Sequence, residues 1–297
     1  MSQKQVERRS LTVSCLANLI FTGLGLWAFL STRIQALFLD CFFSFLSFFS
    51  CIMALTISKV SQKRTKHYPD GLYFLEPLYA IMKSLSILFL LVISVFSTGR
   101  TAWTYFEKGT GSPLITGPVV PYAITMMVIC FGLGFFNQAQ NKKINRISTI
   151  LTAESRSNFI DGLQSGGIGI AVLLLNTLDI NGPYGFLHYT GDFFITTALS
   201  LFSLKEPVKV LLLSFRELSG GTINDKKIEK AIRQSVASHI GGLLPCKNCY
   251  IYKTGMHIRI YLYLAGDCKY EELHTIREKI LAEVHVICET AEIVFCR

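Results

Sequence analysis

Two aspartates lie inside long apolar stretches of the sequence, where an unpaired ionised side chain is costly. Asp40 lies in ALFLDCFFSFLSFF, and Asp161 lies in SRSNFIDGLQSGG. Ser44 follows Asp40 by four residues, so on a helix the two side chains share a face. Ser157 precedes Asp161 by the same spacing, and Asn158 offers a further carbonyl oxygen. Two such helices could enclose one cation in oxygen ligands, which suit hard or borderline metal ions.

The spacing leaves a second interpretation open for both aspartates. A carboxylate inside a membrane can pair with a buried base, or it can lie near a helix end at the membrane surface. Lys83 and Arg156 are the basic residues that could act as such partners. A cation site and internal ion pairs are therefore both compatible with the pattern.

The polar C-terminal part of the chain contains a second candidate metal site. Cys246 and Cys249 form a CxxC pair, a spacing that can chelate a soft metal or cycle as a disulfide. The candidates to complete this site are His257, Cys268, His274 and His285. The alternative interpretation is ordinary thiols of a cytosolic domain. The sequence has no nucleophile–base constellation, phosphate-binding loop or HExxH motif, so an enzyme is not expected.

The elements that must position these residues are mostly membrane spans. The 297-residue chain is 51% hydrophobic and only 16% charged, whereas soluble domains contain about 25% charged residues. Stretches of about 20 apolar residues, long enough to cross a bilayer, predict a bundle of six helices. They are Leu11–Leu30, Ile34–Ile57, Pro77–Thr98, Thr116–Phe136, Ser157–Thr177 and Phe186–Leu204. The fifth stretch is rich in glycine and serine, which predicts close packing in the bundle interior.

Basic residues indicate the orientation of these spans. They precede the first span and follow the second, fourth and sixth, whereas the opposite loops carry only Arg33, Arg100 and Lys108. By the positive-inside rule, both termini are cytosolic. Because the charges flank apolar segments and do not form one face, nucleic-acid binding is not expected despite the net charge of +9. Pro207 should break or kink the sixth helix, and VKVLLLSFREL beyond it is predicted to be an interfacial helix.

From about residue 222 the hydrophobic pattern becomes that of a small soluble domain. Apolar residues from Ile228 to Ile240 fall on one face of a helix that Asn224 or Asp225 could cap. Further predicted elements are a strand at Cys249–Lys253, a turn at Thr254–Gly255, a strand at Met256–Leu264, a helix at Tyr270–Glu283 and a strand at Thr290–Phe295. This α-β-β-α-β order predicts a ferredoxin-like α+β domain at residues 222–297, after a transmembrane domain at residues 1–218. The hydrophobic core of so small a domain gives only marginal stability by itself, and this favours a homodimer that buries more apolar surface.

The arrangement resembles the cation diffusion facilitator family of metal exporters over nearly the whole chain. The most specific segment is YPDGLYFLEPL at Tyr68–Leu78. It is similar to the family signature His-Pro-x-Gly-x-x-x-x-Glu-Pro-Leu at the start of the third helix. By this resemblance, Asp40 is the first ligand of the second-helix pair, and Asp161 is the last ligand of the fifth-helix pair. His274 falls where many members have a histidine that binds metal at the dimer interface. The segments around both aspartates resemble a divergent bacterial branch.

The resemblance implies a secondary transporter in the cell (inner) membrane that exports a divalent cation by alternating access in exchange for protons. It also implies a homodimer joined through the cytosolic domain. No prosthetic group is implied, because the metal ion, which could be Mn, Fe, Zn or a similar ion, is the substrate. Ser44 and Ser157 stand where most members have His or Asp, which favours the harder ions over tightly bound Zn²⁺. The loss of those two ligands also leaves open a non-transporting scaffold or metal sensor with the same fold.

Overall fold

The computed structural model of the chain describes residues 2–32, 35–111, 119–179, 181–240, 246–265 and 270–296. Within these ranges it describes all side chains except those of residues 28, 29, 31, 32, 35–43, 168, 171, 175, 192, 195, 199, 246, 270 and 271. The predicted loop residue Arg33 and the predicted start of the fourth span at Thr116 lie outside the described residues.

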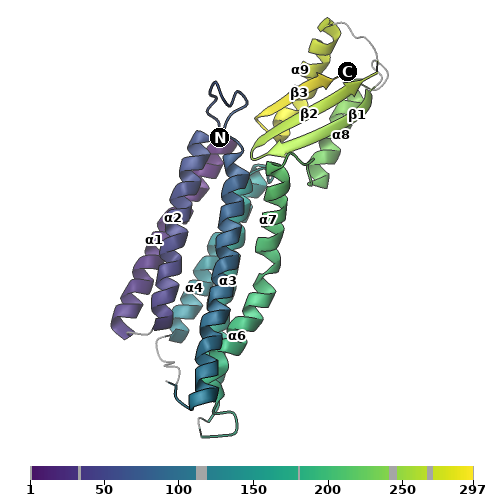
Figure 1. The fold of residues 1–297 in the computed structure, drawn as a ribbon. Helices are drawn as coiled ribbons and strands as arrows, with labels where there is room; N and C mark the ends of the chain where they lie inside the picture. Colours follow the sequence, from purple (N-terminus) through teal and green to yellow (C-terminus); the bar gives the residue numbers. More distant parts are fainter. Residues whose placement is uncertain are drawn as a thin grey trace.

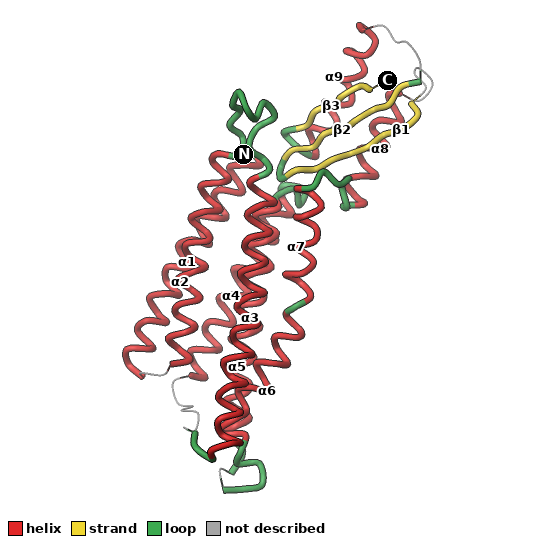
Figure 2. The backbone as a smooth tube through the Cα atoms, viewed as in Figure 1, coloured by secondary structure: helices red, strands yellow, loops and turns green. Residues whose placement is uncertain are grey.

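Each predicted apolar stretch overlaps a helix of an elongated bundle (Figures 1 and 2). The helices are α1 (Gln3–Thr32), α2 (Gln35–Val60), α3 (Leu75–Lys108), α4 (Val119–Lys143), α5 (Thr149–Asn176) and α6 (Leu187–Ser203). Among the described residues, α1, α3 and α4 are long and apolar enough to cross a membrane by length and composition. The prediction that the other three also cross it stays a prediction.

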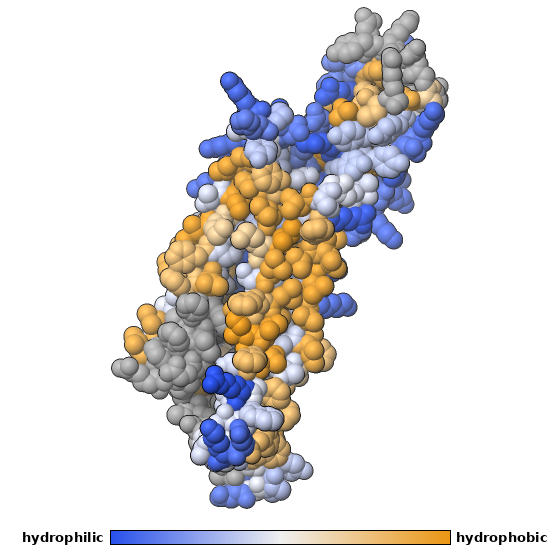
Figure 3. All heavy atoms as spheres, in the orientation of Figure 1, coloured by the Kyte–Doolittle hydropathy of each residue, from blue (hydrophilic) through white to orange (hydrophobic). Residues whose placement is uncertain are grey.

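Large apolar side chains cover the outside of the bundle. Figure 3 shows an apolar surface along the helices, with hydrophilic surface at both ends of the molecule. Phe96 is 73% exposed and Trp103 is 69% exposed, both on α3. Monomeric soluble proteins rarely expose contiguous apolar surface on this scale. The surface of the bundle is therefore suited to lipid.

Small residues allow α5 to pack closely against α4, as the sequence predicts. A Cβ atom added to Gly162 would lie 3.2 Å from the Cβ atom of Cys130. One added to Gly166 would lie 2.5 Å from the Sδ atom of Met127, which is inside van der Waals contact. The prediction that the fifth helix lies in the bundle interior is confirmed at these positions.

The sixth span is broken as predicted, and a second helix follows the break. α6 ends at Ser203, four residues before Pro207, whose ring would clash with that carbonyl in a continuous helix. α7 (Lys205–Leu218) then runs alongside α3 to the end of the bundle (Figure 1). Val210 of α7 is buried in a small apolar cluster with Ala80 of α3 and Ala153 of α5. Packing against α3 and α5 therefore makes α7 part of the bundle, and its predicted place at the membrane interface stays a prediction.

The polar C-terminal part, here called the tail, has the predicted α-β-β-α-β order. Its elements are α8 (Lys226–Ile240), β1 (Cys246–Thr254), β2 (His257–Leu264), α9 (Tyr270–Ile287) and β3 (Ala291–Cys296). In the described residues, β2 is central, antiparallel to β1 and parallel to β3. α8 and α9 lie on one face of this sheet (Figure 1).

The sequence patterns that predict a buried strand face and a helix cap in the tail are confirmed. Ile258, Ile260 and Leu262 of β2 are fully buried, so the alternating pattern does separate a core face from an outer face. The side chain of Asp225 caps α8, because its Oδ1 atom accepts the backbone N–H of Lys227 at 2.9 Å. α9 runs to Ile287, four residues beyond its predicted end.

The turn between β1 and β2 is pressed against the bundle. Gly255 has φ of +58°, and a Cβ atom there would lie 2.8 Å from both Glu76 Oε2 and the Tyr73 carbonyl oxygen. Beside it, the ammonium of Lys253 lies 2.7 Å from a carboxylate oxygen of Glu217 on α7. Arg259 of β2 forms an ion pair with Asp70 in the loop before α3. The tail is therefore docked on one end of the bundle by contacts from two strands.

Gly255→Ala is expected to weaken this docking. A non-glycine residue at positive φ costs about 1–3 kcal/mol, and the new Cβ would also displace the segment around Glu76 and Tyr73. Amide hydrogen exchange in β1 and β2 of the full-length protein should accelerate. Gly220→Ala is the matched control, since Gly220 has φ of +77° and nothing within 4 Å of its added Cβ. Equal acceleration in both variants would show that contact with the bundle does not matter.

Candidate cation site

A small polar cavity of about 40 Å³ lies among α1, α2, α4 and α5. It is lined by Asn18, Phe21, Ser44, Ser47, Met126, Cys130, Asp161, Gln164 and Ser165. The structure therefore brings Ser44 of α2 and Asp161 of α5 to the same cavity, although they are 117 positions apart in the sequence. Asp40 lies one helical turn before Ser44 in α2. Its side chain is outside the described residues, so a meeting of the two aspartates stays a prediction.

Asp161 also borders a second, larger cavity of about 240 Å³. Ser157 and Gln164 of α5 line this cavity together with Tyr79 and Lys83 of α3. Its lining runs along α3 from Tyr79, four residues from the start of that helix, to Ser94, so the cavity reaches toward the end that carries the tail and also away from it. Asp161 is thus a half-buried carboxylate that borders two cavities.

The serines and the asparagine predicted to accompany Asp161 have different positions. Ser157 is buried and lines the larger cavity, and Ser44 lines the smaller one. Asn158 is also buried but lines neither of these two cavities. Its side-chain amide nitrogen has no hydrogen-bond partner among the described residues.

Lys83, which lines the larger cavity, belongs to a buried ion pair. The ammonium of Lys83 lies 2.5 Å from Glu154 Oε1, with the two side chains 6% and 1% exposed. The hydroxyl of Tyr79 also donates a hydrogen bond to Glu154, and Ser50 Oγ lies 3.0 Å from that hydroxyl. Arg156 lies 3.3 Å from Glu206. Each base that could have paired with a membrane aspartate therefore has a glutamate partner.

Sequence reasoning overlooked several polar groups of this region. Glu154 precedes the predicted fifth span, which was expected to begin at Ser157, but α5 begins at Thr149 and contains it. Asn18 and Gln164 line the small cavity with Asp161 and lie in predicted spans. A polar side chain within a span is itself a functional signal, and applying that signal to neutral amides would have found both.

A second cluster of buried charged residues lies at the end of the bundle that contacts the tail. The ammonium of Lys4 lies 2.8 Å from Glu7 Oε1 and 2.6 Å from Glu76 Oε1. Ser148, just before α5, donates a hydrogen bond to Glu7 Oε2 at 2.5 Å. Glu76 is the glutamate of the YPDGLYFLEPL segment, and the Gly255 turn lies beside it. This part of the signature therefore joins α1, α3 and the tail.

The candidate metal site of the tail is only partly described. Cys249 is half-buried and packs against the apolar core, and His274 is exposed on α9. The Cys246 side chain and Cys268 lie outside the described residues. Among the residues that the structure does describe, no three His, Cys, Asp or Glu side chains are grouped closely enough to hold a metal ion. Metal binding by Cys246, Cys249 and His274 stays a prediction.

His257, another candidate ligand, lies at the junction of tail and bundle. Its buried ring stacks on Tyr73 with centroids 5.1 Å apart. Neither ring nitrogen has a hydrogen-bond partner among the described residues. Burial, and to a smaller extent the guanidinium of Arg259, lowers the pKa of His257 below its ordinary value of 6.5. The docked tail therefore keeps this histidine neutral at pH 7.

Acid is expected to weaken the docking of the tail through His257. The docked state binds fewer protons here than an undocked tail, so the stabilisation present above pH 6.5 is lost as pH falls through the lowered pKa. Limited proteolysis at residues 219–221 should be faster at pH 5.5 than at pH 7.5. His257→Phe keeps a ring against Tyr73 but cannot titrate, so its cleavage should depend less on pH. A wild-type rate that does not change with pH would contradict this role.

The bundle and its cavities lie within a recognised family domain. The sequence matches the cation efflux transmembrane domain over residues 11–219, which covers more than half of the chain. The matched segment includes α2 and α5, which carry the two membrane aspartates. No curated protein matches the chain. The chain therefore belongs to the cation efflux family of membrane transporters, which move metal cations out of the cytosol.

Proposed function

We propose that this protein exports a divalent metal cation from the cytosol in exchange for protons, with Asp161 and Asp40 as its charged ligands. The observation that carries the proposal is the shared cavity of Ser44 and Asp161 inside an apolar bundle. Two carboxylates would carry a formal charge of −2 and balance one divalent ion. Ser44 and Ser157 would add neutral oxygen ligands from the same two helices.

Proton exchange follows from the location of the carboxylates. A carboxylate in a low-dielectric cavity is costly as a free anion, so it takes up either a cation or a proton. The larger cavity would admit the ion from the tail side, past Lys83 and Glu154. Alternating access would then close that side and open the opposite one, where protons replace the metal at Asp161 and Asp40.

The side chains of the small cavity support a range of divalent ions. Carboxylate and hydroxyl oxygens favour Mn²⁺ or Fe²⁺. Cys130 and Met126 of α4 line the same cavity, and their sulfur atoms favour softer ions such as Zn²⁺. The balance between oxygen and sulfur ligands around the ion would set which divalent metal the protein prefers.

The proposal includes the topology and assembly that the sequence suggests. Both termini lie in the cytosol, residues 1–218 form the transmembrane domain in the cell (inner) membrane, and residues 222–297 form the cytosolic domain. A homodimer through the cytosolic domain is supported by the sheet face opposite α8 and α9. That face exposes Tyr250 and Tyr263, and tyrosine is enriched in the buried centres of protein interfaces.

The decisive experiment is a metal panel in proteoliposomes that contain a pH-sensitive dye. Addition of Mn²⁺, Fe²⁺, Zn²⁺ or Mg²⁺ on one side should move protons in the opposite direction for the transported ions. Metal transport without proton movement would refute the exchange. In cells, equal metal accumulation with wild type and with Asp40→Ala plus Asp161→Ala would instead favour a scaffold or sensor that does not transport.

A further inference from the structure

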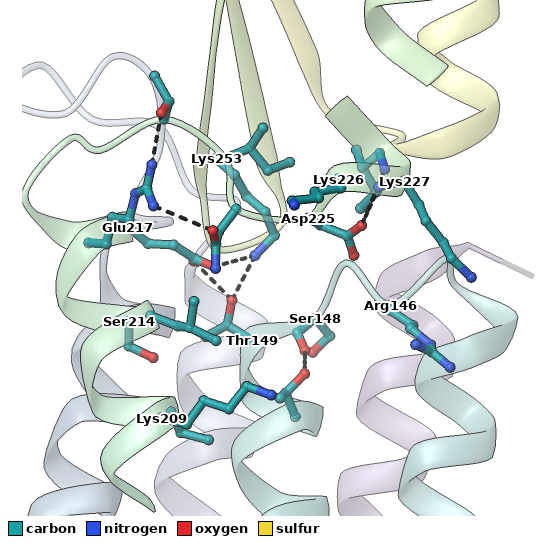
Figure 4. Close-up of a pocket in the computed structure, with 18 residues that line it drawn as sticks. Arg146, Ser148, Thr149, Lys209, Ser214, Glu217, Asp225, Lys226, Lys227 and Lys253 are labelled. Carbon is teal, nitrogen blue, oxygen red and sulfur yellow. Dashed lines mark hydrogen bonds and ion pairs between the residues drawn. The ribbon is translucent and has the colours of Figure 1, made fainter. Parts of the chain in front are cut away.

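A large cavity lies at the junction of bundle and tail, apart from the candidate cation site. Its volume is about 460 Å³, which is within the range of about 300–1,000 Å³ typical of small-ligand pockets. It is enclosed by the start of α5, one face of α7, the segment leading into α8, and β1 (Figure 4). In Figure 4, Lys209 points from α7 toward α5, and Arg146 and Lys227 extend on the opposite side of the pocket.

The lining of this cavity has an excess of positive charge. Its basic residues are Arg146, Lys209, Arg216, Lys226, Lys227 and Lys253, and its acidic residues are Glu217 and Asp225. Both carboxylates are already engaged, since Glu217 pairs with Lys253 and Asp225 caps α8. Among the described residues, Arg146, Lys209, Lys226 and Lys227 have no carboxylate within 4.0 Å. The cavity therefore favours an anion.

The surface beside the cavity favours an anion that also has an apolar part. Leu201 and Phe202 of α6 are 68% and 79% exposed, and they precede Lys209 by about two helical turns on the side away from the tail. Figure 3 shows apolar surface along the bundle giving way to hydrophilic surface toward the tail. A phospholipid beside α7 would therefore have its acyl chains along the apolar face and its headgroup at the level of the cavity.

We propose that this cavity binds the phosphate-bearing headgroup of an anionic phospholipid, with the acyl chains along Leu201 and Phe202. Basic pockets at the cytosolic ends of membrane helices bind anionic headgroups in this manner. The headgroup would bridge α5 and α7 of the bundle to α8 of the tail. This binding is independent of the proposed transport chemistry, because no residue of the small cavity takes part.

The test is lipid titration of the full-length protein in detergent, followed by native mass spectrometry. Short-chain phosphatidylglycerol, phosphatidylcholine and inorganic phosphate are the three probes. The cavity variant carries Arg146→Gln, Lys209→Gln and Lys227→Gln. The control carries Lys63→Gln, Arg64→Gln and Lys66→Gln, which removes three exposed charges from the loop after α2 at the same end of the bundle. Lys209→Glu is a second cavity variant that changes one residue only. It should not disturb folding, because this side chain is exposed.

Phosphatidylglycerol is expected to bind wild type and the control equally and to bind the cavity variant at least about tenfold more weakly. Lys209→Glu should weaken binding in the same direction, and phosphatidylcholine should bind poorly to all forms. Equal losses in the cavity and control variants, or no loss in either, would overturn the proposal. Inorganic phosphate that binds as tightly as phosphatidylglycerol would assign the cavity to a soluble anion and overturn the lipid assignment.

Discussion

Asp161→Asn should reduce metal-driven transport in proteoliposomes by more than about 100-fold. Loss of a residue that merely supports a metal ligand costs 10–100-fold, and this substitution removes a proposed ligand and half of the charge that balances the ion. Asparagine has nearly the same size, so the cavity shared with Ser44 keeps its shape. Ser44→Ala and Ser157→Ala remove neutral oxygens and should have smaller effects.

Two companion variants make this result interpretable. Asp179→Asn removes an exposed carboxylate from the segment just after α5, outside both cavities, and should transport like wild type. Asp40→Asn should match Asp161→Asn if both carboxylates hold the same ion. Wild-type transport by Asp161→Asn would remove the basis for the proposed cation site.

The elements of the fold could be predicted from local patterns because each pattern reports burial directly. The alternation in β2 identified Ile258, Ile260 and Leu262 as core residues, and each is fully buried. Apolar stretches located the bundle helices for the same reason. The packing partners of a segment are harder to predict when they come from distant parts of the sequence. α7 is amphipathic, and its sequence does not reveal whether its less exposed face meets α3 or the membrane surface.

The candidate site was predictable in part. Ser44 and Asp161 were identified because polar groups are rare within apolar stretches, and they do share a cavity. The pairing of Lys83 with Glu154 was missed because the two residues are 71 positions apart and Glu154 lies in a polar sequence. Such a segment joins a membrane helix only because a partner on another helix neutralises its charge. Apolar periodicity cannot reveal a partner of this kind.

Glu154→Gln should impair both stability and transport, because it leaves the charge of Lys83 without its partner. Removing one partner of a buried ion pair destabilises a protein by about 3–5 kcal/mol, and thermal unfolding in detergent should show a lower midpoint. Gln keeps an acceptor for the hydroxyl of Tyr79, so the loss is mainly electrostatic. Asp161 borders the same cavity as Lys83. The unpaired ammonium would therefore compete with the metal for that carboxylate, and the apparent metal affinity should fall.

Lys83→Met added to Glu154→Gln separates this competition from simple misfolding. The double variant has no buried charge left at this position, and replacing a whole buried pair by neutral side chains is often harmless to stability. Its unfolding midpoint and its metal affinity should both recover toward wild type. Recovery of stability without recovery of metal affinity would mean that the ion pair itself is needed for metal binding. In that case the loss of affinity in Glu154→Gln comes from the missing ion pair and not from competition by the free ammonium of Lys83.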